Sequence, residues 1–121
     1  MEWGPRALGN RSILAHPGLP HMKNVLNARI KYRESFRPLA PAILAEYVSD
    51  YFEQEQESPY MMITADVAKS HHLPRDFNTE TSFGIDRLKQ HRSDIPAVTH
   101  IDYSARIQTV HRDTNPRFHA L

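Results

Sequence analysis

The chain contains no cysteine, so neither a disulfide framework nor a thiolate metal site can hold it together. Its 121 residues, 40% of them hydrophobic, can bury one compact core but are few for two domains. We therefore expect a single domain, or a piece of one, over residues 1–121. The sequence has no apolar run of about 18 residues and no leader peptide, so the expected location is the cytoplasm, with no membrane contact.

Positive charge is concentrated in the first third of the chain. The formal net charge is only +1, yet residues 1–37 carry seven basic side chains against two acidic ones. The remaining residues carry eight basic and twelve acidic side chains. This asymmetry favours a first part that faces a small anion, rather than a chain that binds a long polyanion such as nucleic acid.

Turn residues and hydrophobic spacing divide the chain into short elements of a mixed α/β type. Apolar residues at helical spacing predict a helix over 21–30, with Pro20 suited to its first turn. Pro38 and Pro41 exclude a helix through the basic segment 31–38. The other expected elements are a strand over 11–16, a buried strand passing into a short helix over 39–52, a solvated loop over 53–59, a strand over 60–67, a polar insertion or loop around 67–94, and strands over 95–102 and 105–112.

The two ends of the sequence predict that the chain is a fragment of a larger protein. Asn115 followed by Pro116 is a strong helix start, but the sequence stops at Leu121. At the other end, Met1 stands directly before the motif described next.

The run "GPRALGNRSIL", residues 4–14, combines two glycines and a proline with Arg6 and Arg11. Glycines allow backbone N–H groups to approach a ligand closely, and arginine presents a planar fork of donors that matches phosphate. The run is therefore either a structural turn or a cradle for an anion. The spacing is less diagnostic than a phosphate-binding loop motif, so the residues alone leave both interpretations open.

Three further basic residues are candidates for anion binding. In an extended segment, Lys31 and Arg33 would point to the same face and could converge with Arg37 on one phosphate. The alternative is a solvated basic edge. Arg106, in "SARIQTV", either reaches the solvent or is directed at an anion.

Other kinds of chemistry have little support in the sequence. Eight histidines include no HxxxH or HExxH pair, and His71 and His72 fall in the polar insertion, so we expect no metal site in this chain. A nucleophilic serine elbow is absent as well. Glu34, Asp66 and Asp102 are possible general bases or magnesium ligands, and the spacing selects none of them.

A likeness to a known family is carried by "MEWGPRALGNRSILAHP", "MKNVLNARIKYRESFRPLAPAIL", "ESPYMM" and "IPAVTHIDYSARIQTVHRDTNPRF". Together they resemble the C-terminal domain of the O-carbamoyltransferases, which include nodulation-factor and antibiotic-tailoring enzymes. The resemblance covers the chain except about 67–93. It implies a YrdC-like fold, a twisted open mixed sheet with few helices, that uses ATP and Mg²⁺ to convert carbamoyl phosphate to carbamoyl-adenylate.

The resemblance also implies a partner and a set of roles. An N-terminal actin-like domain would hold an iron-type metal and transfer the carbamoyl group to an acceptor hydroxyl. The phosphate-binding positions of the family fall on Arg6, Lys31 and Arg106, with Lys31 and Arg106 as catalytic residues. Arg33 completes a K-x-R similar to the YrdC nucleotide cavity. Tyr103 and Ser104 depart from the family's usual glycine and threonine.

Two other interpretations remain open. A non-catalytic RNA- or partner-binding YrdC-like module would bind RNA with a steep salt dependence. The low net charge argues against it. A truncated remnant would fold only with a partner domain and would self-associate when isolated.

Overall fold

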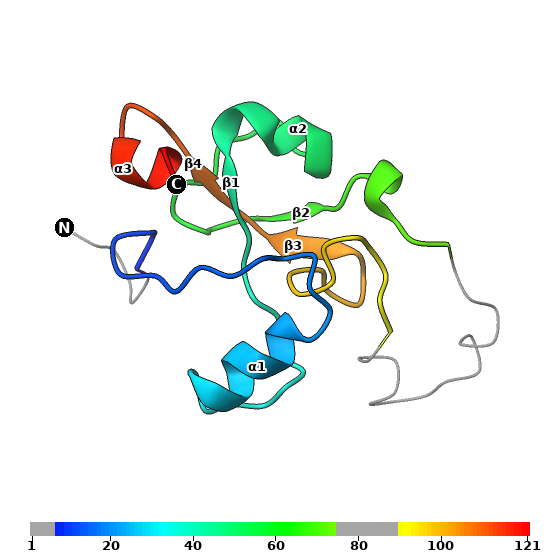
Figure 1. Ribbon diagram of the computed structural model, residues 1–121. Helices are drawn as coiled ribbons and strands as arrows, with labels where there is room; N and C mark the ends of the chain where they lie inside the picture. The colour runs from blue at the N-terminus through cyan, green and yellow to red at the C-terminus, as the bar shows by residue number, and fades with distance from the viewer. Residues whose placement is uncertain (1–6, 75–89) are drawn as a thin grey trace.

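Short helices surround two small sheets in the computed structural model, which describes residues 7–74 and 90–121 (Figure 1). The helical segments are α1 (Met22–Arg29), η1 (Ala45–Tyr47), α2 (Val48–Tyr51), η2 (Lys69–His71) and α3 (Pro116–His119), of which η1 and η2 are 3₁₀ turns. The described part of the chain is thus a small α/β structure with few helices, as the sequence predicts. None of its helices is long and apolar enough to cross a membrane.

Strand pairing joins segments that lie far apart in the sequence. β1 (Ala42–Leu44) runs parallel to β4 (Gln108–Val110). β2 (Thr64–Asp66) runs antiparallel to β3 (Ser104–Arg106). Because only Ile107 separates β3 from β4, the two sheets meet in the middle of the molecule (Figure 1). The pairing is therefore mixed, as expected, while the YrdC-like identity of the fold stays a prediction.

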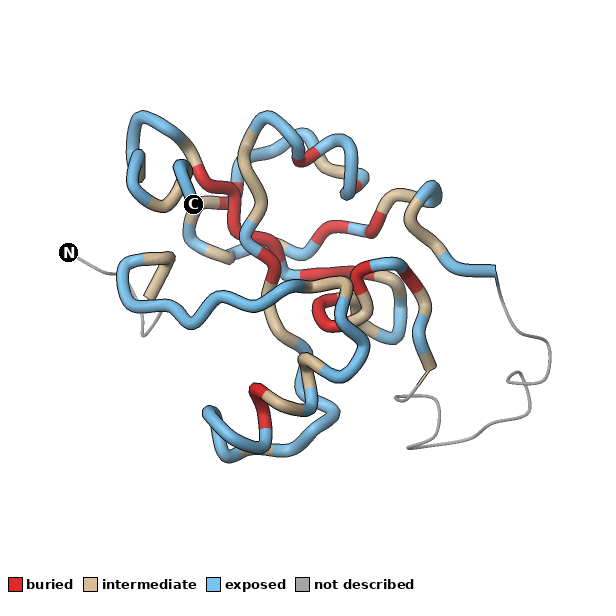
Figure 2. Tube along the Cα trace, viewed as in Figure 1, coloured by how far each residue is buried: buried red, intermediate tan, exposed pale blue. Residues whose placement is uncertain are grey.

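The hydrophobic core lies around this junction, where the buried residues concentrate in Figure 2. Alternation along the β2–β3 pair places Ala65 and Ala105 inward and Thr64 and Arg106 outward. Ile107 is completely buried. The core cluster consists of Val48, Phe52, Ala65, Val67, Ile95, Val98, Ala105 and Ile107, with Leu39 and Ile43 packed against it.

Elements with local sequence signals form where they are expected. α1 lies within the predicted helix 21–30, and Pro20 immediately precedes its N-cap, His21. The Asn115 side chain accepts a hydrogen bond from the Phe118 N–H, with Pro116 at the first helical position of α3. The buried strand passing into a short helix over 39–52 is confirmed by β1, η1 and α2.

The strand predicted over 11–16 does not form. Ile13 and Leu14 are 60% and 54% exposed, and no strand of the described residues pairs with this segment. Hydrophobic alternation predicts a strand only where a partner supplies a ladder of hydrogen bonds, and none is available here.

The strand predicted over 95–102 is also wrong. This segment makes consecutive turns, closed by hydrogen bonds from the Val98 N–H to the Ile95 carbonyl and from the Tyr103 N–H to the His100 carbonyl. The Thr99 hydroxyl donates to the Ile95 carbonyl as well, so a side chain occupies an acceptor that a ladder would need. The strand predicted over 60–67 is limited to β2, because Met61 lies in the left-handed region at φ 57°.

The insertion predicted around 67–94 stays a prediction, because residues 75–89 lie outside the described part of the chain. Its described ends lie side by side. The Leu73 N–H donates to the Arg92 carbonyl at 2.9 Å, and His72 forms an antiparallel bridge with Ser93.

Candidate functional site

The basic segment after α1 is organised around Asn27, which is completely buried. Its Nδ2 donates to the carbonyls of Ser35 and Arg37, at 3.3 and 2.8 Å. Its Oδ1 accepts from Arg33 Nε at 2.7 Å, and a second nitrogen of Arg33 donates to the Pro38 carbonyl at 3.4 Å. The Arg33 guanidinium is therefore engaged in holding this loop.

The extended geometry that would align Lys31 with Arg33 is not present. Tyr32, between them, lies in the left-handed region at φ 47°, so alternation along a strand does not apply. Arg37 forms an ion pair with Glu34, with N and O 2.9 Å apart. The Lys31 side chain is exposed and has no hydrogen bond or ion pair within the described residues.

Arg106 lies on the outward face of β3, opposite Thr64 of β2. Its side chain is exposed, and no hydrogen bond or ion pair from the described residues holds the guanidinium. Nor does any such contact there join Arg106 to Lys31 or Arg33. The structure therefore leaves Arg106 and Lys31 available to an anion but places them on separate elements.

A hydrogen-bonded turn leads directly into Arg106. The Ser104 hydroxyl donates to Asp102 Oδ1 at 2.7 Å, and the Ser104 N–H donates to the same oxygen at 3.1 Å. His100 Nδ1 lies 3.0 Å from the Ser104 hydroxyl oxygen. The His100 N–H also donates to the Ser104 carbonyl at 2.8 Å, which closes the turn.

The turn sets the charges of its two titratable groups. Burial lowers the pKa of His100 below its ordinary 6.5; the negative charge of Asp102 opposes this and the positive charge of Arg106 adds to it. Hydrogen bonds from the Ser104 hydroxyl and N–H lower the pKa of Asp102. At neutral pH, a neutral imidazole and an ionised carboxylate therefore stand beside the Arg106 cation.

The described part of the glycine-containing run, residues 7–14, forms a tight turn against α3. The Asn10 N–H donates to the Ala7 carbonyl at 2.9 Å, and Gly9 has φ 90°. A Cβ on Gly9 would overlap the ring of Phe118, so glycine is required here for both space and backbone angle. Arg6 lies outside the described residues.

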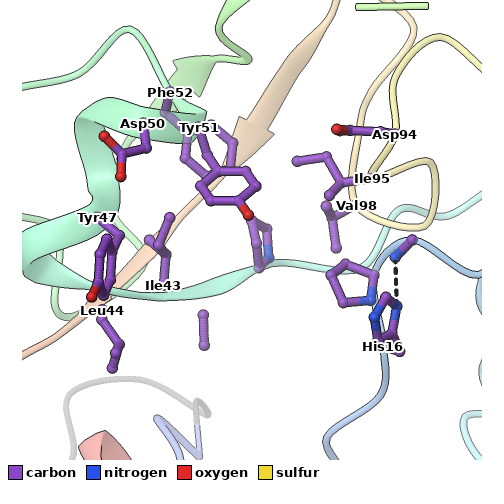
Figure 3. Close-up of a pocket in the computed structure, with 14 residues that line it drawn as sticks. His16, Ile43, Leu44, Tyr47, Asp50, Tyr51, Phe52, Asp94, Ile95 and Val98 are labelled. Atoms are coloured by element: carbon purple, nitrogen blue, oxygen red, sulfur yellow. Dashed lines mark hydrogen bonds between the residues drawn. The ribbon is translucent and has the colours of Figure 1, made fainter. Parts of the chain in front are cut away.

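A groove of about 690 Å³ opens between residues 16–18, β1, α2 and the turn at 94–98. Figure 3 shows the Tyr51 ring in its middle, with Tyr47 to one side and Ile95 and Val98 to the other. The charged side chains that line it are the carboxylates Asp50 and Asp94, and its lining residues include no lysine or arginine. The groove therefore does not fit a phosphate group, and none of the predicted anion-binding residues lines it.

His71 joins two walls of this groove. Its Nδ1 lies 2.7 Å from Asp94 Oδ2, and its Nε2 lies 3.0 Å from the Asp50 carbonyl oxygen. The imidazole stacks on Tyr51 with ring centroids 4.4 Å apart. The hydrogen bond to Asp94 raises the pKa of His71 above its ordinary 6.5, although partial burial opposes this. His71 therefore supports the groove wall structurally.

Comparison with known families identifies the family to which the chain belongs. The model of a family described as carbamoyltransferase C-terminus matches residues 1–121. The chain belongs to this family. The match includes the Gly9 turn, the Asn27 loop and the turn before Arg106.

Curated relatives of this carbamoyltransferase C-terminal domain are much longer proteins. An uncharacterised Synechocystis protein, sll1178, is 58% identical over the whole chain, which spans 20% of that protein. Nodulation protein NolNO of Sinorhizobium fredii is 39% identical over 97% of the chain, which spans 15% of it. The 3'-hydroxymethylcephem-O-carbamoyltransferase of Amycolatopsis lactamdurans is 38% identical over 99% of the chain, which spans 19% of it.

Sequence reasoning missed two side chains at the candidate site of the carbamoyltransferase C-terminal domain. The sequence offers Asp102 as one of three candidate carboxylates, but it does not single out His100, and Ser104 stands out only as a departure from the family pattern. Their signal is the spacing of His100, Asp102, Ser104 and Arg106 at every second residue. Within residues 7–74 and 90–121, no group of three His, Cys, Asp or Glu side chains is arranged to hold a metal ion.

Proposed function

We propose that this domain is the nucleotide-activating part of an ATP-dependent O-carbamoyltransferase in the cytoplasm. It binds carbamoyl phosphate and ATP and forms carbamoyl-adenylate. An N-terminal actin-like domain of the same enzyme, which holds the iron-type metal, transfers the carbamoyl group to an acceptor hydroxyl. The observation that carries this proposal is the family match over residues 1–121, together with 38% identity to a relative named as an O-carbamoyltransferase.

The available cations support phosphate binding by this domain. Arg106 and Lys31 are exposed and have no hydrogen bond or ion pair within the described residues. A guanidinium binds phosphate oxygens in a bidentate manner, and lysine adds a mobile charge. Transfer between phosphates is catalysed mainly by positioning and by electrostatic stabilisation of the transition state, which requires such cations rather than a protein nucleophile. Arg6 and Arg33 complete the proposed set, with Arg33 acting through the loop that it holds.

Magnesium would be held by Asp66. Glu34 pairs with Arg37, and Asp102 accepts hydrogen bonds from Ser104, whereas the exposed Asp66 carboxylate has no such partner in the described chain. Asp66 also lies on β2, the strand paired with β3. One carboxylate, phosphate oxygens and waters form a donor set that suits Mg²⁺, which would neutralise phosphate charge when bound.

Isothermal titration tests this proposal. The 121-residue chain is titrated with fresh carbamoyl phosphate, and then with a non-hydrolysable ATP analogue and Mg²⁺. Lys31→Glu and Arg106→Gln should abolish binding of both ligands, while Lys69→Gln, the same loss of one charge on η2, should leave it unchanged. Urea denaturation shows whether each variant is folded. Full binding by folded Lys31→Glu and Arg106→Gln proteins would overturn the assignment.

A further inference from the structure

The hydrogen-bond network before β3 determines which nitrogen of His100 carries a proton. An ionised carboxylate only accepts hydrogen bonds, so the Ser104 hydroxyl must donate its single proton to Asp102 Oδ1, 2.7 Å away. The same hydroxyl oxygen lies 3.0 Å from His100 Nδ1 and can only accept there. His100 Nδ1 is therefore protonated, and in the neutral imidazole Nε2 carries a lone pair.

In the described part of the chain, this lone pair is unpaired, and it is not completely buried. His100 Nε2 has no hydrogen-bond partner within the described residues, where no buried side-chain nitrogen or oxygen lacks a partner. Nε2 therefore retains some contact with solvent. The charged groups that act on the imidazole are Asp102, which is committed to Ser104, and Arg106, which has no hydrogen bond or ion pair in the described chain. Among the described residues, an unpaired, half-buried acceptor thus stands near an exposed cation.

An acceptor beside a cation fits a ligand with a particular pair of groups. The cation requires an anionic oxygen, and the acceptor requires an N–H or O–H donor a short distance away. Carbamoyl phosphate carries both, a phosphate and an amide NH₂. An acyl phosphate with a methyl group in place of the NH₂ offers no donor at this place.

We propose that His100 is a specificity-determining residue whose Nε2 accepts a hydrogen bond from the carbamoyl NH₂ of a ligand that Arg106 binds through its phosphate. Ser104 and Asp102 are positioning residues that fix the tautomer. This inference rests on the proposed function and deepens it, because it explains how the domain selects a carbamoyl group over other acyl phosphates.

Two stable ligands of equal charge and similar shape test this inference. Phosphonoacetamide carries an NH₂ group, and 2-oxopropylphosphonate carries a methyl group at the same place. The wild-type 121-residue chain should bind phosphonoacetamide about tenfold more tightly, since one hydrogen bond contributes about 1 kcal/mol or somewhat more. His100→Phe should remove this preference. His100→Gln, which keeps an acceptor, should retain part of it, and Lys69→Gln should not change it.

The imidazole ¹⁵N spectrum provides a readout that is independent of ligand affinity. Without ligand, His100 should show a protonated Nδ1 and an unprotonated Nε2. Ser104→Ala should lose this fixed tautomer. Addition of phosphonoacetamide, but not of 2-oxopropylphosphonate, should shift the Nε2 resonance.

The outcomes separate this inference from the proposed function. Equal affinity for the two ligands, an unchanged preference in folded His100→Phe, or a protonated Nε2 would overturn the role of His100, and phosphate binding by Arg106 would still stand. Failure of the folded wild-type chain to bind either phosphonate, or carbamoyl phosphate, would overturn the proposed function together with the inference.

Discussion

Asn27 explains why the irregular segment after α1 is ordered. A buried amide is costly unless its polar atoms are paired, and here both Nδ2 and Oδ1 have partners in residues 33–37. The helical pattern predicts that α1 forms, but it does not reveal this role. The partners of Asn27 are two backbone carbonyls and one arginine, whose positions depend on the path of the following loop.

Replacing Asn27 by alanine should lower the free energy of unfolding by about 1–3 kcal/mol, because the Arg33 guanidinium and two carbonyls lose their partner. Asn24→Ala, on the exposed side of the same helix, is the matched control and should change stability by less than about 0.5 kcal/mol. Urea denaturation followed by circular dichroism measures both. Equal stability of the two variants would contradict the structural role of Asn27.

Tyr103 adopts an unfavourable backbone conformation. Its φ of 66° is in the left-handed region, where residues with a Cβ are disfavoured, and its ring stacks on His72 with centroids 4.4 Å apart. Glycine, which the family resemblance predicts at this place, would adopt this backbone angle without strain.

Tyr103→Gly should therefore be more stable than Tyr103→Ala by about 1 kcal/mol, although both lose the stacked ring. At Ala28, in the last turn of α1, the order should be reversed, and Ala28→Gly should be destabilised relative to the alanine. Thermal and urea unfolding of the three variants provide the comparison. If Tyr103→Ala proves the more stable of the pair, the left-handed backbone angle is not present in solution.

At the scale of elements, local sequence signals predict the helices, but they do not predict which segments pair as strands. The helix start at Asn115 and Pro116 and the helix over 21–30 depend on neighbouring residues, and both are confirmed. The strands predicted over 11–16 and 95–102 have suitable residues but no ladder. Conversely, the parallel register of β1 with β4 has no local signal, because the paired residues Ala42 and Gln108 lie 66 positions apart in the sequence.

The contact between the Gly9 turn and α3 gives a prediction at this scale. Gly9→Ala should destabilise the protein by about 1–2 kcal/mol from the backbone angle alone, with an additional loss from overlap with Phe118. In a double-mutant cycle, Phe118→Ala should remove the additional loss but not the backbone cost. Additive effects of the two substitutions, measured by urea denaturation, would show that the turn and α3 are not in contact.

At the scale of the whole molecule, His71 connects α2 to the turn at 94–98 and to the base of the predicted insertion. The raised pKa means that the folded state binds a proton more tightly than the unfolded chain. The resulting stabilisation is fully present below the ordinary pKa of 6.5 and is lost as the pH rises through the higher folded value. Stability from this contact therefore decreases toward alkaline pH.

Asp94→Asn isolates this effect, because His100 and the other titrating groups are the same in both proteins. The stability difference between wild type and Asp94→Asn should be largest below the ordinary pKa of 6.5 and should shrink as the pH rises through the raised folded pKa of His71. Glu55→Gln removes one negative charge from an exposed loop and should show no such trend. Urea denaturation across this pH range tests it, and a difference that grows with pH would contradict the assigned direction.

The candidate site could be predicted from the sequence only in part. Arg106 is found as a lone arginine in a strand, and the family resemblance predicts that it binds phosphate. Lys31 is available to an anion because Tyr32 is left-handed, and Arg33 is held in the loop by the buried Asn27. Neither feature leaves a local pattern in the sequence. The role of His100 depends on the direction of the Ser104 hydroxyl proton. That direction follows from the hydrogen bond of Ser104 to Asp102, which only the folded turn reveals.

The packing of the Gly9 turn against α3 also sets an order of events during synthesis. The Asn115 side chain donates to the Leu8 carbonyl across 107 positions of sequence. At translation rates of about 5–20 residues per second, the turn is synthesised roughly 5–20 s before Asn115. During that interval the glycine-containing run has no ring to pack against. The glycine-containing turn is therefore among the last parts of this domain to take its final position.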